Sequence, residues 1–447
     1  MRSPDNTSKD LFHDNELTCV FFNKLFIFLY DMKQFNLSMK SKLATVLISS
    51  FALYSCSNGT TGAETNTVDS IYPAVEKNEA NTKYKPAFAG QTRINGVKTN
   101  TAFEGVVLNT TLKSPWGIAA LPDGRLLITE KEGTFRIATT DGKVSEPITG
   151  LPKVDSDGQG GLLGLTIDPN FETNRMIYFV FAEPSAEGNL TAVGKGKLSA
   201  DDKTIENVAV IYRATPKYKG KLHYGGRILF DKSGNLIVST GERSDLATRP
   251  QAQDLKSGLG KIVRITTDGA PASGNPFAGQ ADVRPEIYSY GHRNVQGLAL
   301  HPETGDLWET EFGPRGGDEL NRIEAGKNYG WPTITYGLEY SGEKVGDAIQ
   351  QKEGLEQPVY YWDPVLSPSG ITFYTGDRIP EWKNNLFISG LSSTHIARLV
   401  IKDNKVVGEE RLLAKEGQRF RDITQGKDGA LYAITDLGRL YKIDKKN

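Results

Sequence analysis

This sequence contains little cysteine and little methionine, and it has almost no excess of charge of either sign. Two of its 447 residues are cysteine and four are methionine, whereas 47 are glycine. The 53 lysines and arginines are balanced by 54 aspartates and glutamates, so the composition gives no indication of a nucleic-acid partner or a polybasic membrane contact. Abundant glycine beside scarce methionine favours a turn-rich β protein over a helical bundle.

The apolar stretch nearest the N-terminus is too short to span a bilayer. It covers residues 19–30 and is interrupted by Lys24, whereas a membrane-spanning helix needs about 20 apolar residues. Residues 39–56 are typical of a secretory signal, because a basic start precedes the short apolar core LATVLISSFALY. We therefore interpret residues 1–38 as an extension ahead of a start at Met39.

The end of that signal, Leu53-Tyr54-Ser55-Cys56, resembles a bacterial lipobox, in which the cysteine is lipidated and becomes the mature N-terminus. We expect a lipid anchor at Cys56 and a location in the cell envelope, on the periplasmic side or the outer surface. Cys56 would then be the only cysteine of the mature chain, which excludes a disulfide, a cysteine metal site and a thiol nucleophile. Residues 57–88 are polar and are expected to form a disordered tether. The folded domain is expected over 89–447.

One pattern recurs from residue 116 to residue 435: a small residue, a short apolar strand, a tight turn and a second apolar strand. The turns contain Asp-Gly, Ser-Gly or Thr-Gly, so each unit is predicted to be a β-hairpin. The six units lie at 116–130, 163–181, 226–240, 297–311, 369–390 and 421–435. They predict an all-β fold, a six-bladed β-propeller with four-stranded antiparallel blades. A β-sandwich with insertions is the alternative, but it would not explain why one motif recurs.

Polar residues at the entrances of the units are candidates for a functional site, since loops on one face would gather there. Gln159 precedes two glycines at the second unit, where the backbone can approach a ligand closely. His223 precedes two glycines at the third unit, and a neutral imidazole is a suitable base near pH 7. Glu242, one hairpin later, can orient it. A lone histidine with a purely structural role is the alternative, which we adopt for His292, His301 and His395.

The run 288–332 concentrates polar groups around a single apolar strand. Arg293 and Asn294 offer donors that suit a planar ligand rich in carbonyls and carboxylates. The loop that begins at Gly313 and ends in Asp318-Glu319 turns carbonyls outward beside two acids, which suits a hard cation such as calcium. The alternative is an arginine that pins a loop beside solvated acids.

Arg419 and Arg421 open the last unit. On a strand these two positions point the same way, so two guanidinium groups converge on one place. Such a pair requires an anion, which is either a bound carboxylate or the neighbouring Asp422 and Glu416.

Taken together, these segments resemble the pyrroloquinoline-quinone-dependent soluble aldose dehydrogenases, the family that includes soluble glucose dehydrogenase. The resemblance covers the chain from about residue 112 to its end. It is carried by GQGGLLGL, HYGGR, YGHRNVQGLA, GPRGGDELN, KNYGWP and QRFRD, which follow one another in the order of that family. The family is a six-bladed propeller, in agreement with the repeat.

The resemblance implies a role for each matching residue. His223 would be the general base and Glu242 its support. Contacts to pyrroloquinoline quinone (PQQ) would come from six side chains: Gln159, Arg293, Asn294, Tyr340, Arg419 and Arg421. The carbonyls of Gly313 and Pro314 would hold the calcium that also binds the quinone. Glu319 and the carbonyl of Tyr329 match a second, structural calcium site.

Two positions depart from the family pattern. Ser392 stands where many members have a lysine, which puts one ammonium contact to the quinone in doubt. Leu222 stands where the glucose enzyme has an aspartate just before its catalytic histidine, which puts a preference for glucose in doubt and resembles the broader aldose dehydrogenases.

The implied reaction is oxidation of the anomeric carbon of an aldose sugar. His223 would take the hydroxyl proton while calcium polarises the quinone and Arg293 stabilises negative charge on it. An external acceptor, a quinone or a cytochrome, would then remove the electrons, and the sequence leaves a monomer or a dimer open. Two alternatives remain: a calcium-dependent propeller lactonase, and a non-catalytic surface propeller that binds a partner.

Overall fold

The computed structural model describes residues 72–446, and the predicted signal and lipid anchor lie outside these residues. Within them, no helix is long and apolar enough to cross a membrane. Helical structure in the described part of the chain is confined to α2 (Phe171–Asn174) and three short 3-10 turns, Arg249–Ala252, Pro380–Trp382 and Ala414–Glu416.

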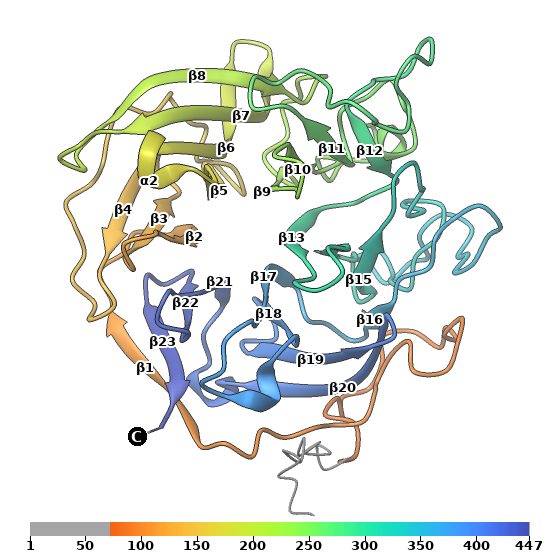
Figure 1. Ribbon diagram of the computed structural model, residues 1–447. Coiled ribbons are helices and arrows are strands. Elements are labelled where there is room, and N and C mark those ends of the chain that lie inside the picture. The colour runs from red at the N-terminus through yellow and green to blue at the C-terminus, as the bar shows by residue number, and fades with distance from the viewer. Residues whose placement is uncertain (1–71, 447) are drawn as a thin grey trace, which may run out of the picture. The chain divides into compact units, whose positions relative to one another are not determined.

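Six antiparallel sheets surround a central channel and confirm the predicted six-bladed β-propeller (Figure 1). The first blade consists of β2 (Pro115–Ala120), β3 (Leu126–Glu130) and β4 (Thr134–Ala138), and the second of β5 (Leu162–Ile167), β6 (Met176–Ser185), β7 (Gly188–Leu198) and β8 (Ile205–Arg213). The third blade consists of β9 (Gly225–Phe230), β10 (Leu236–Thr240), β11 (Lys261–Ile265) and β12 (Ile287–Tyr290), and the fourth of β13 (Val295–Leu300), β14 (Leu307–Glu311), β15 (Asp318–Ile323) and β16 (Tyr360–Trp362).

The last two blades close the ring. The fifth consists of β17 (Pro368–Phe373), β18 (Leu386–Gly390), β19 (Ile396–Lys402) and β20 (Lys405–Leu412), and the sixth of β21 (Phe420–Gln425), β22 (Leu431–Thr435) and β23 (Leu440–Lys445). The outer strand of the sixth blade is β1 (Phe103–Asn109), which pairs with β23 from Phe103 opposite Lys445 onward. The first and last described strands therefore share one sheet, as Figure 1 shows.

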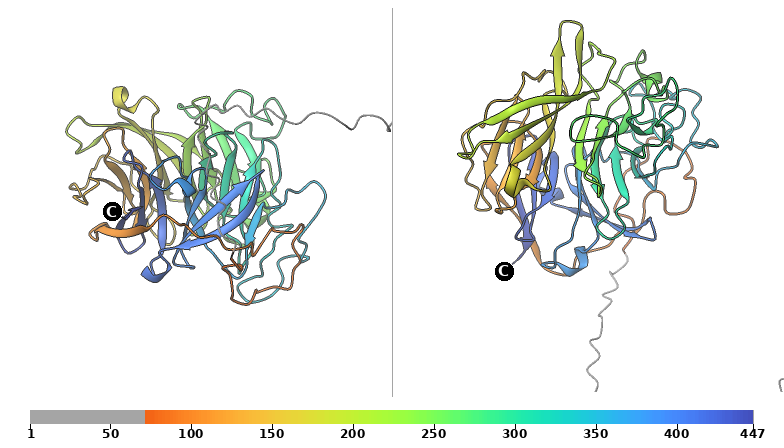
Figure 2. Two further views of the ribbon diagram at one scale, coloured as in Figure 1. Left: turned by 60° about the horizontal axis from the view of Figure 1, so that its bottom comes forward. Right: turned by 45° about the horizontal axis from the view of Figure 1, so that its top comes forward.

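Five sheets have the predicted four strands, and the first blade has three. Its fourth position is taken by an irregular segment that forms single bridges to β4, at Phe135 with Ile148 and at Ala138 with Val144. In the second blade β6 and β7 are the longest strands of the described chain, at 10 and 11 residues, and their hairpin projects from the ring in Figure 2 (right).

Each of the six predicted hairpins forms the inner two strands of one blade. Neighbouring inner strands contact one another around the channel, and this crowding explains the recurring glycine. A Cβ on Gly164 would lie 2.4 Å from the carbonyl oxygen of Gly226, and one on Gly370 would lie 1.6 Å from a carboxylate oxygen of Asp422. No side chain fits at either position.

A buried ion pair joins four blades at the channel. Arg227 on β9 lies with Nη1 2.6 Å from Oδ2 of Asp422 on β21. The Arg227 Nε donates to the carbonyl of Gln296 on β13, and Asp422 accepts from the backbone N–H of Ile118 on β2. The apolar core lies between the blades, where alternate strand residues of adjacent sheets pack together.

The segment before β1 differs from the prediction. The tether was expected to extend to residue 88, but residues 72–88 contact the propeller. Glu76 pairs with Arg411 at 2.6 Å, and the backbone N–H of Asn81 donates to Asp363 at 2.8 Å. The boundary is misplaced because these few polar residues find charged partners on the blades, which composition alone does not reveal.

Candidate active site

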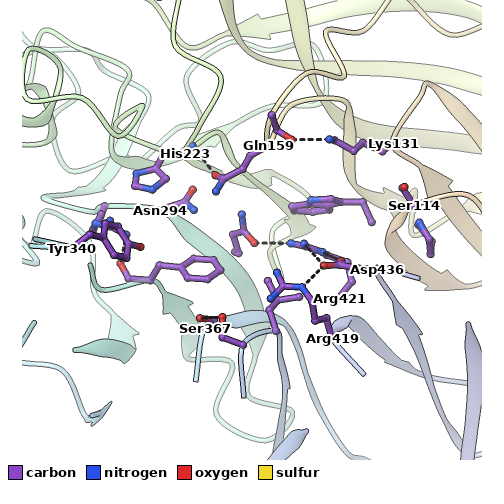
Figure 3. A pocket seen from close by; sticks show the side chains of 18 residues that line it. Ser114, Lys131, Gln159, His223, Asn294, Tyr340, Ser367, Arg419, Arg421 and Asp436 are labelled. Carbon is purple, nitrogen blue, oxygen red and sulfur yellow. Dashed lines mark hydrogen bonds and ion pairs between the residues drawn. The ribbon is translucent and has the colours of Figure 1, made fainter. Parts of the chain in front are cut away.

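A cavity of about 460 Å³ opens where the inner strands of the blades begin and the second strands end. These ends lie on one face of the propeller because the two strands of each hairpin are antiparallel. The cavity is lined from several blades, as Figure 3 shows, by Ser114, Trp116, Lys131, Gln159, His223, Arg293, Asn294, Gln296, Tyr340, Ser392, Arg419, Arg421 and Asp436. Seven of the predicted functional side chains are among them.

His223 and Glu242 form a buried pair at this cavity. His223 Nδ1 lies 2.6 Å from Glu242 Oε1, and the exposed fractions of the two residues are 5% and 1%. Since Nδ1 is engaged, Nε2 is the ring nitrogen left for a ligand in the cavity. Burial first, and the positive charge of Arg293 second, lower the pKa of His223 to about 4, and the hydrogen bond to Glu242 offsets only part of this. The imidazole is therefore neutral at pH 7.

The backbone of His223 has a φ of 45°, in the left-handed region that a histidine rarely occupies. Two neighbours hold it there. The side-chain oxygen of Gln159 accepts from the His223 backbone N–H at 2.9 Å, and Arg243 Nε donates to the carbonyl of Leu222 at 3.0 Å. Gln159 is therefore placed beside the predicted base as well as beside the cavity.

Arg293 and Asn294 enter the cavity from the start of β13. Their backbone N–H groups donate to Glu311 Oε2, at 2.5 and 3.3 Å. The Asn294 side chain accepts from the N–H of Gly225 at 3.0 Å. The Arg293 guanidinium donates to the carbonyl of Gly313 at 2.8 Å, while its Nε is buried and has no partner within the described residues.

Arg419 and Arg421 converge as predicted, but on a different anion. Both bind Asp436, through Nε contacts of 2.8 Å each. Neither suggested partner is used, because Asp422 pairs with Arg227 and Glu416 accepts from the hydroxyl of Tyr441. In Figure 3 these arginines lie across the cavity from His223 and Asn294.

Tyr340 and the two departures from the family pattern lie at the rim. Tyr340 lines the cavity with 71% of its surface exposed. Ser392 lines it too, and its hydroxyl bonds to that of Ser367 at 2.9 Å. Leu222, just before the histidine, is 41% exposed.

The residues predicted to bind calcium lie in and beside a second, much smaller cavity. It is lined by Gly313, Glu319 and Tyr329, together with Glu311 and Arg293. The Gly313 loop is fixed by Asp318, which accepts from the Gly313 N–H and from the N–H groups of Leu366 and Ser367. Gly313, predicted at the quinone calcium, thus shares a cavity with the predicted structural site, whereas Pro314 lies outside it.

Asp436, Trp116 and Lys131 are cavity residues that the sequence analysis did not identify. Arg227 stacks over the Trp116 ring at 4.2 Å, and Lys131 donates to the carbonyl of Gly158. A signal for Asp436 was present: in four units an acid ends the second strand or follows it within two residues. Those acids are Glu130, Glu242, Glu311 and Asp436.

The charges of the cavity suit an anionic, planar ligand. Four basic side chains line it, Lys131, Arg293, Arg419 and Arg421, against the single carboxylate of Asp436. A surplus of guanidinium groups in a partly dry cavity requires anions, and a neutral histidine at the opposite wall can accept a proton. Such an arrangement can deprotonate a hydroxyl beside a bound, negatively charged cofactor.

Comparison with known proteins agrees with this arrangement. Residues 112–442 match the model of the Glucose / Sorbosone dehydrogenase family. The chain is 41% identical over 346 residues to aldose sugar dehydrogenase YliI of Escherichia coli, covering 76% of this chain and 92% of that protein. It is 26% identical over 424 residues to quinoprotein glucose dehydrogenase B of Acinetobacter calcoaceticus, covering 76% and 87%.

Solved structures give the same result. The PQQ-bound aldose sugar dehydrogenase of Streptomyces coelicolor is 31% identical with a TM-score of 0.63, over 78% of this chain and 99% of that one. A structure described as a glucose dehydrogenase is 45% identical with a TM-score of 0.74, over 77% and 99%. The fold, the cavity and these matches together identify the chain as an enzyme of the glucose/sorbosone dehydrogenase family.

Proposed function

We propose that this protein oxidises the anomeric carbon of aldose sugars to lactones, with PQQ as hydride acceptor and His223 as general base. The observation that carries the proposal is the buried His223–Glu242 pair facing a cavity lined by Arg293, Arg419 and Arg421. A lactonase would not need three guanidinium groups around its ligand, and a binding module would not need a neutral buried base.

The cavity residues fit PQQ, which is planar and carries three carboxyl groups. A volume of about 460 Å³ is within the range of cofactor pockets. The basic surplus matches the carboxylates, and the unpartnered Nε of Arg293 offers a buried donor. Arg293, Arg419, Arg421, Gln159, Asn294 and Tyr340 would hold the cofactor.

The calcium sites also have suitable donors. Neutral carbonyls such as those of Gly313 and Pro314 are ligands that calcium accepts, and a carboxylate such as Glu319 beside the Tyr329 backbone is another. The Gly313 carbonyl already accepts a bond from Arg293, but a carbonyl oxygen has a second lone pair for a cation.

His223 performs the proton transfer. Its Nε2 takes the proton of the anomeric hydroxyl as the C–H bond breaks with its electron pair, and a C=O bond forms to give the lactone. PQQ supplies the carbon that accepts the hydride when it is bound. Glu242 holds the imidazole by Nδ1 and stabilises the imidazolium that forms. Arg293 would stabilise negative charge on the bound cofactor with little reorganisation, since its backbone and guanidinium are already fixed.

Reconstitution tests the function. Purified protein is mixed with PQQ and calcium, and dye reduction is followed after addition of a panel of aldoses. Activity that requires both additions is expected. Hydrolysis of a sugar lactone without PQQ would support the lactonase alternative, and absence of both lactone hydrolysis and PQQ binding would leave the binding-module alternative.

Calcium and PQQ are expected to bind with positive coupling. Gly313 and Pro314 offer only neutral carbonyls, so the anionic cofactor must complete the shell of the ion, and each ligand should raise the affinity for the other. Calorimetric titration of PQQ with and without calcium measures the coupling. Equal PQQ affinities in the two titrations would contradict it.

We propose that the mature protein is tethered by lipid at Cys56, outside the cytoplasm, where it meets sugars and passes electrons to an external quinone or cytochrome. Two or three acyl chains are sufficient for stable anchoring. Cys56→Ser is expected to release active enzyme into the soluble fraction with unchanged specific activity. A Ser variant that stays with the membrane would exclude this form of anchoring.

A further inference from the structure

A buried histidine and two buried glutamates form a cluster behind the catalytic cavity, in the fourth blade. His292 precedes β13, and Glu309 and Glu311 lie on β14, two residues apart, so their side chains share one face of the sheet. Their exposed fractions are 0%, 0% and 3%. One ligand atom from each lies within 4.8 Å of the other two.

The negative charge of this cluster has no permanent counter-charge among the described side chains. Within residues 72–446, no lysine or arginine forms an ion pair with Glu309 or Glu311, and His292 is their only basic contact. Glu319, opposite Glu311 on the paired strand, adds a third carboxylate. Two or three buried carboxylates without a cation cost several kcal/mol. Either protons or a metal ion must therefore neutralise them.

Two unpartnered oxygens favour a metal ion over protons alone. Glu309 Oε2 and Asn321 Oδ1 are buried and have no hydrogen-bond partner among the described residues. The Asn321 amide lies against Glu309, since its Nδ2 donates to Glu309 Oε1 at 2.7 Å. A buried oxygen without a hydrogen-bond partner is costly unless a ligand reaches it, and both residues are at most 1% exposed.

The distances from His292 to the two glutamates match a coordination shell. His292 Nδ1 lies 3.1 Å from Glu311 Oε1 and 4.0 Å from Glu309 Oε1. Ligands about 2.1 Å from a shared ion would be roughly 3.0–4.2 Å from one another. The other ring nitrogen, Nε2, lies 2.8 Å from Ser289 Oγ. That contact can fix the imidazole with Nδ1 free, as an outer partner does for a metal-bound histidine.

We propose that His292, Glu309 and Glu311 bind a divalent first-row transition ion, of the manganese or zinc kind. Imidazole nitrogen suits these ions, whereas calcium takes oxygen ligands. The site is thus distinct in chemistry from the calcium expected at Glu319 and Tyr329. It does not depend on the proposed sugar oxidation.

Glu311 connects the ion to the catalytic cavity. While Oε1 faces His292, Oε2 accepts the backbone N–H groups of Arg293 and Asn294. An ion on Glu311 would hold that carboxylate in place and brace the backbone from which both cofactor-facing side chains extend. The role of the ion is structural positioning, with no part in the chemical step.

Manganese is the probe for the test. Protein freed of metal by chelator is titrated with Mn²⁺, and pulsed EPR is used to detect the hyperfine coupling of an imidazole ¹⁴N. We expect one Mn²⁺ with this coupling, and its loss in His292→Gln. Glu309→Gln, which removes one charge at constant shape, should weaken Mn²⁺ binding at least about 10- to 100-fold, the loss usual for even an outer partner. Circular dichroism checks that both variants fold.

Glu319→Gln is the matched control, because it removes the charge of the third carboxylate, which is not among the proposed ligands, while leaving the three ligands intact. It should keep the nitrogen coupling. Mn²⁺ bound through oxygen alone, or binding that is abolished by Glu319→Gln and unchanged in Glu309→Gln, would overturn the proposal and assign the ion to the adjacent cavity. No stoichiometric Mn²⁺ or Zn²⁺ binding would overturn it in favour of protonated carboxyl groups.

Discussion

Replacing His223 with glutamine is expected to lower the turnover of sugar oxidation by about two to four orders of magnitude, the contribution usual for a general base. The glutamine amide fills a similar volume and can still bond to Glu242, so the loss should reflect proton transfer and not collapse of the cavity. Reconstituted enzyme with saturating PQQ and calcium is assayed by dye reduction. PQQ affinity should change little.

The matched control is His301→Gln. His301 lies in the turn of the fourth hairpin, outside the cavity, and accepts backbone N–H groups of its own turn. Its replacement should leave turnover within about twofold of the wild type, as expected for a surface turn far from the chemistry. Near-normal turnover in a folded His223→Gln protein would contradict the role of His223 as base.

The same histidine predicts the acid limb of the pH profile. Burial and Arg293 lower its pKa to about 4, so the free base is present above that value. The kcat/KM value should therefore fall as the pH drops through about 4, and not near 6.5 as for an exposed histidine. Glu242→Gln removes two contributions that raise this pKa, so the limb should move to lower pH while turnover falls. A limb near 6.5 in the wild type would contradict the burial argument.

The propeller could be predicted because its signal is repeated. Five of the six inner hairpins carry a glycine at a position where a neighbouring blade approaches too closely for a side chain, as at Gly164 and Gly370, and the sixth has Asp422 instead. Local turn chemistry and packing across the channel thus require the same residues. The outer strands carry no such constraint: β1 is separated from its partner β23 by more than 300 residues of sequence, and only the closed ring reveals their pairing.

The side chains of the site could be predicted only where they resemble a family motif. The acids that bind them are determined by how the strands of each hairpin pair in the folded sheet. The acid at or just after the end of the second strand of a hairpin lies beside the start of the first strand of the same blade. Glu242 binds His223, Glu311 binds the backbone of Arg293, and Asp436 binds Arg419. Glu130 does the same for the backbone N–H of Lys113. A hairpin that returns over two short strands brings these two ends together.

Asp436 was not identified from the sequence as the partner of the two arginines, although it follows the second strand of its hairpin as Glu242 does. Sequence spacing places Asp422 and Glu416 much nearer to the two arginines, but Asp422 already faces the channel. On a strand adjacent residues point to opposite faces, so Arg421 and Asp422 cannot serve one another. The register of β21 with β22 decides the partner, and that register is a property of the folded sheet.

Replacing Asp422 with asparagine is expected to lower the free energy of unfolding by about 3–5 kcal/mol, the cost of leaving one member of a buried ion pair without its partner. Arg227 is buried at the channel, where Asp422 is its only carboxylate contact within the described residues. The asparagine keeps the shape but not the charge. Urea denaturation, followed by tryptophan fluorescence, gives the free energy.

Two further variants test whether the loss of stability comes from the unpaired charge of Arg227. Asp444→Asn breaks the exposed pair with Arg378 and should cost less than about 1 kcal/mol. Arg227→Met combined with Asp422→Leu removes both charges and should recover much of the loss, since an apolar pair of similar volume avoids the unpaired charge. A cost below about 1 kcal/mol for Asp422→Asn would show that the channel admits enough water to solvate Arg227.

Asp422→Asn should also affect the cofactor cavity, because Arg227 is hydrogen-bonded to the backbone of Arg421 as well as to Asp422. Its Nη2 donates to the Arg421 carbonyl at 3.1 Å, and its guanidinium stacks on Trp116, which lines the cavity. In Asp422→Asn the Arg227 guanidinium loses the ion pair that holds it over the Trp116 ring. The strand that carries Arg421 then packs against a less ordered arginine. PQQ affinity should therefore fall in Asp422→Asn and stay unchanged in Asp444→Asn, which calorimetry under native conditions measures directly.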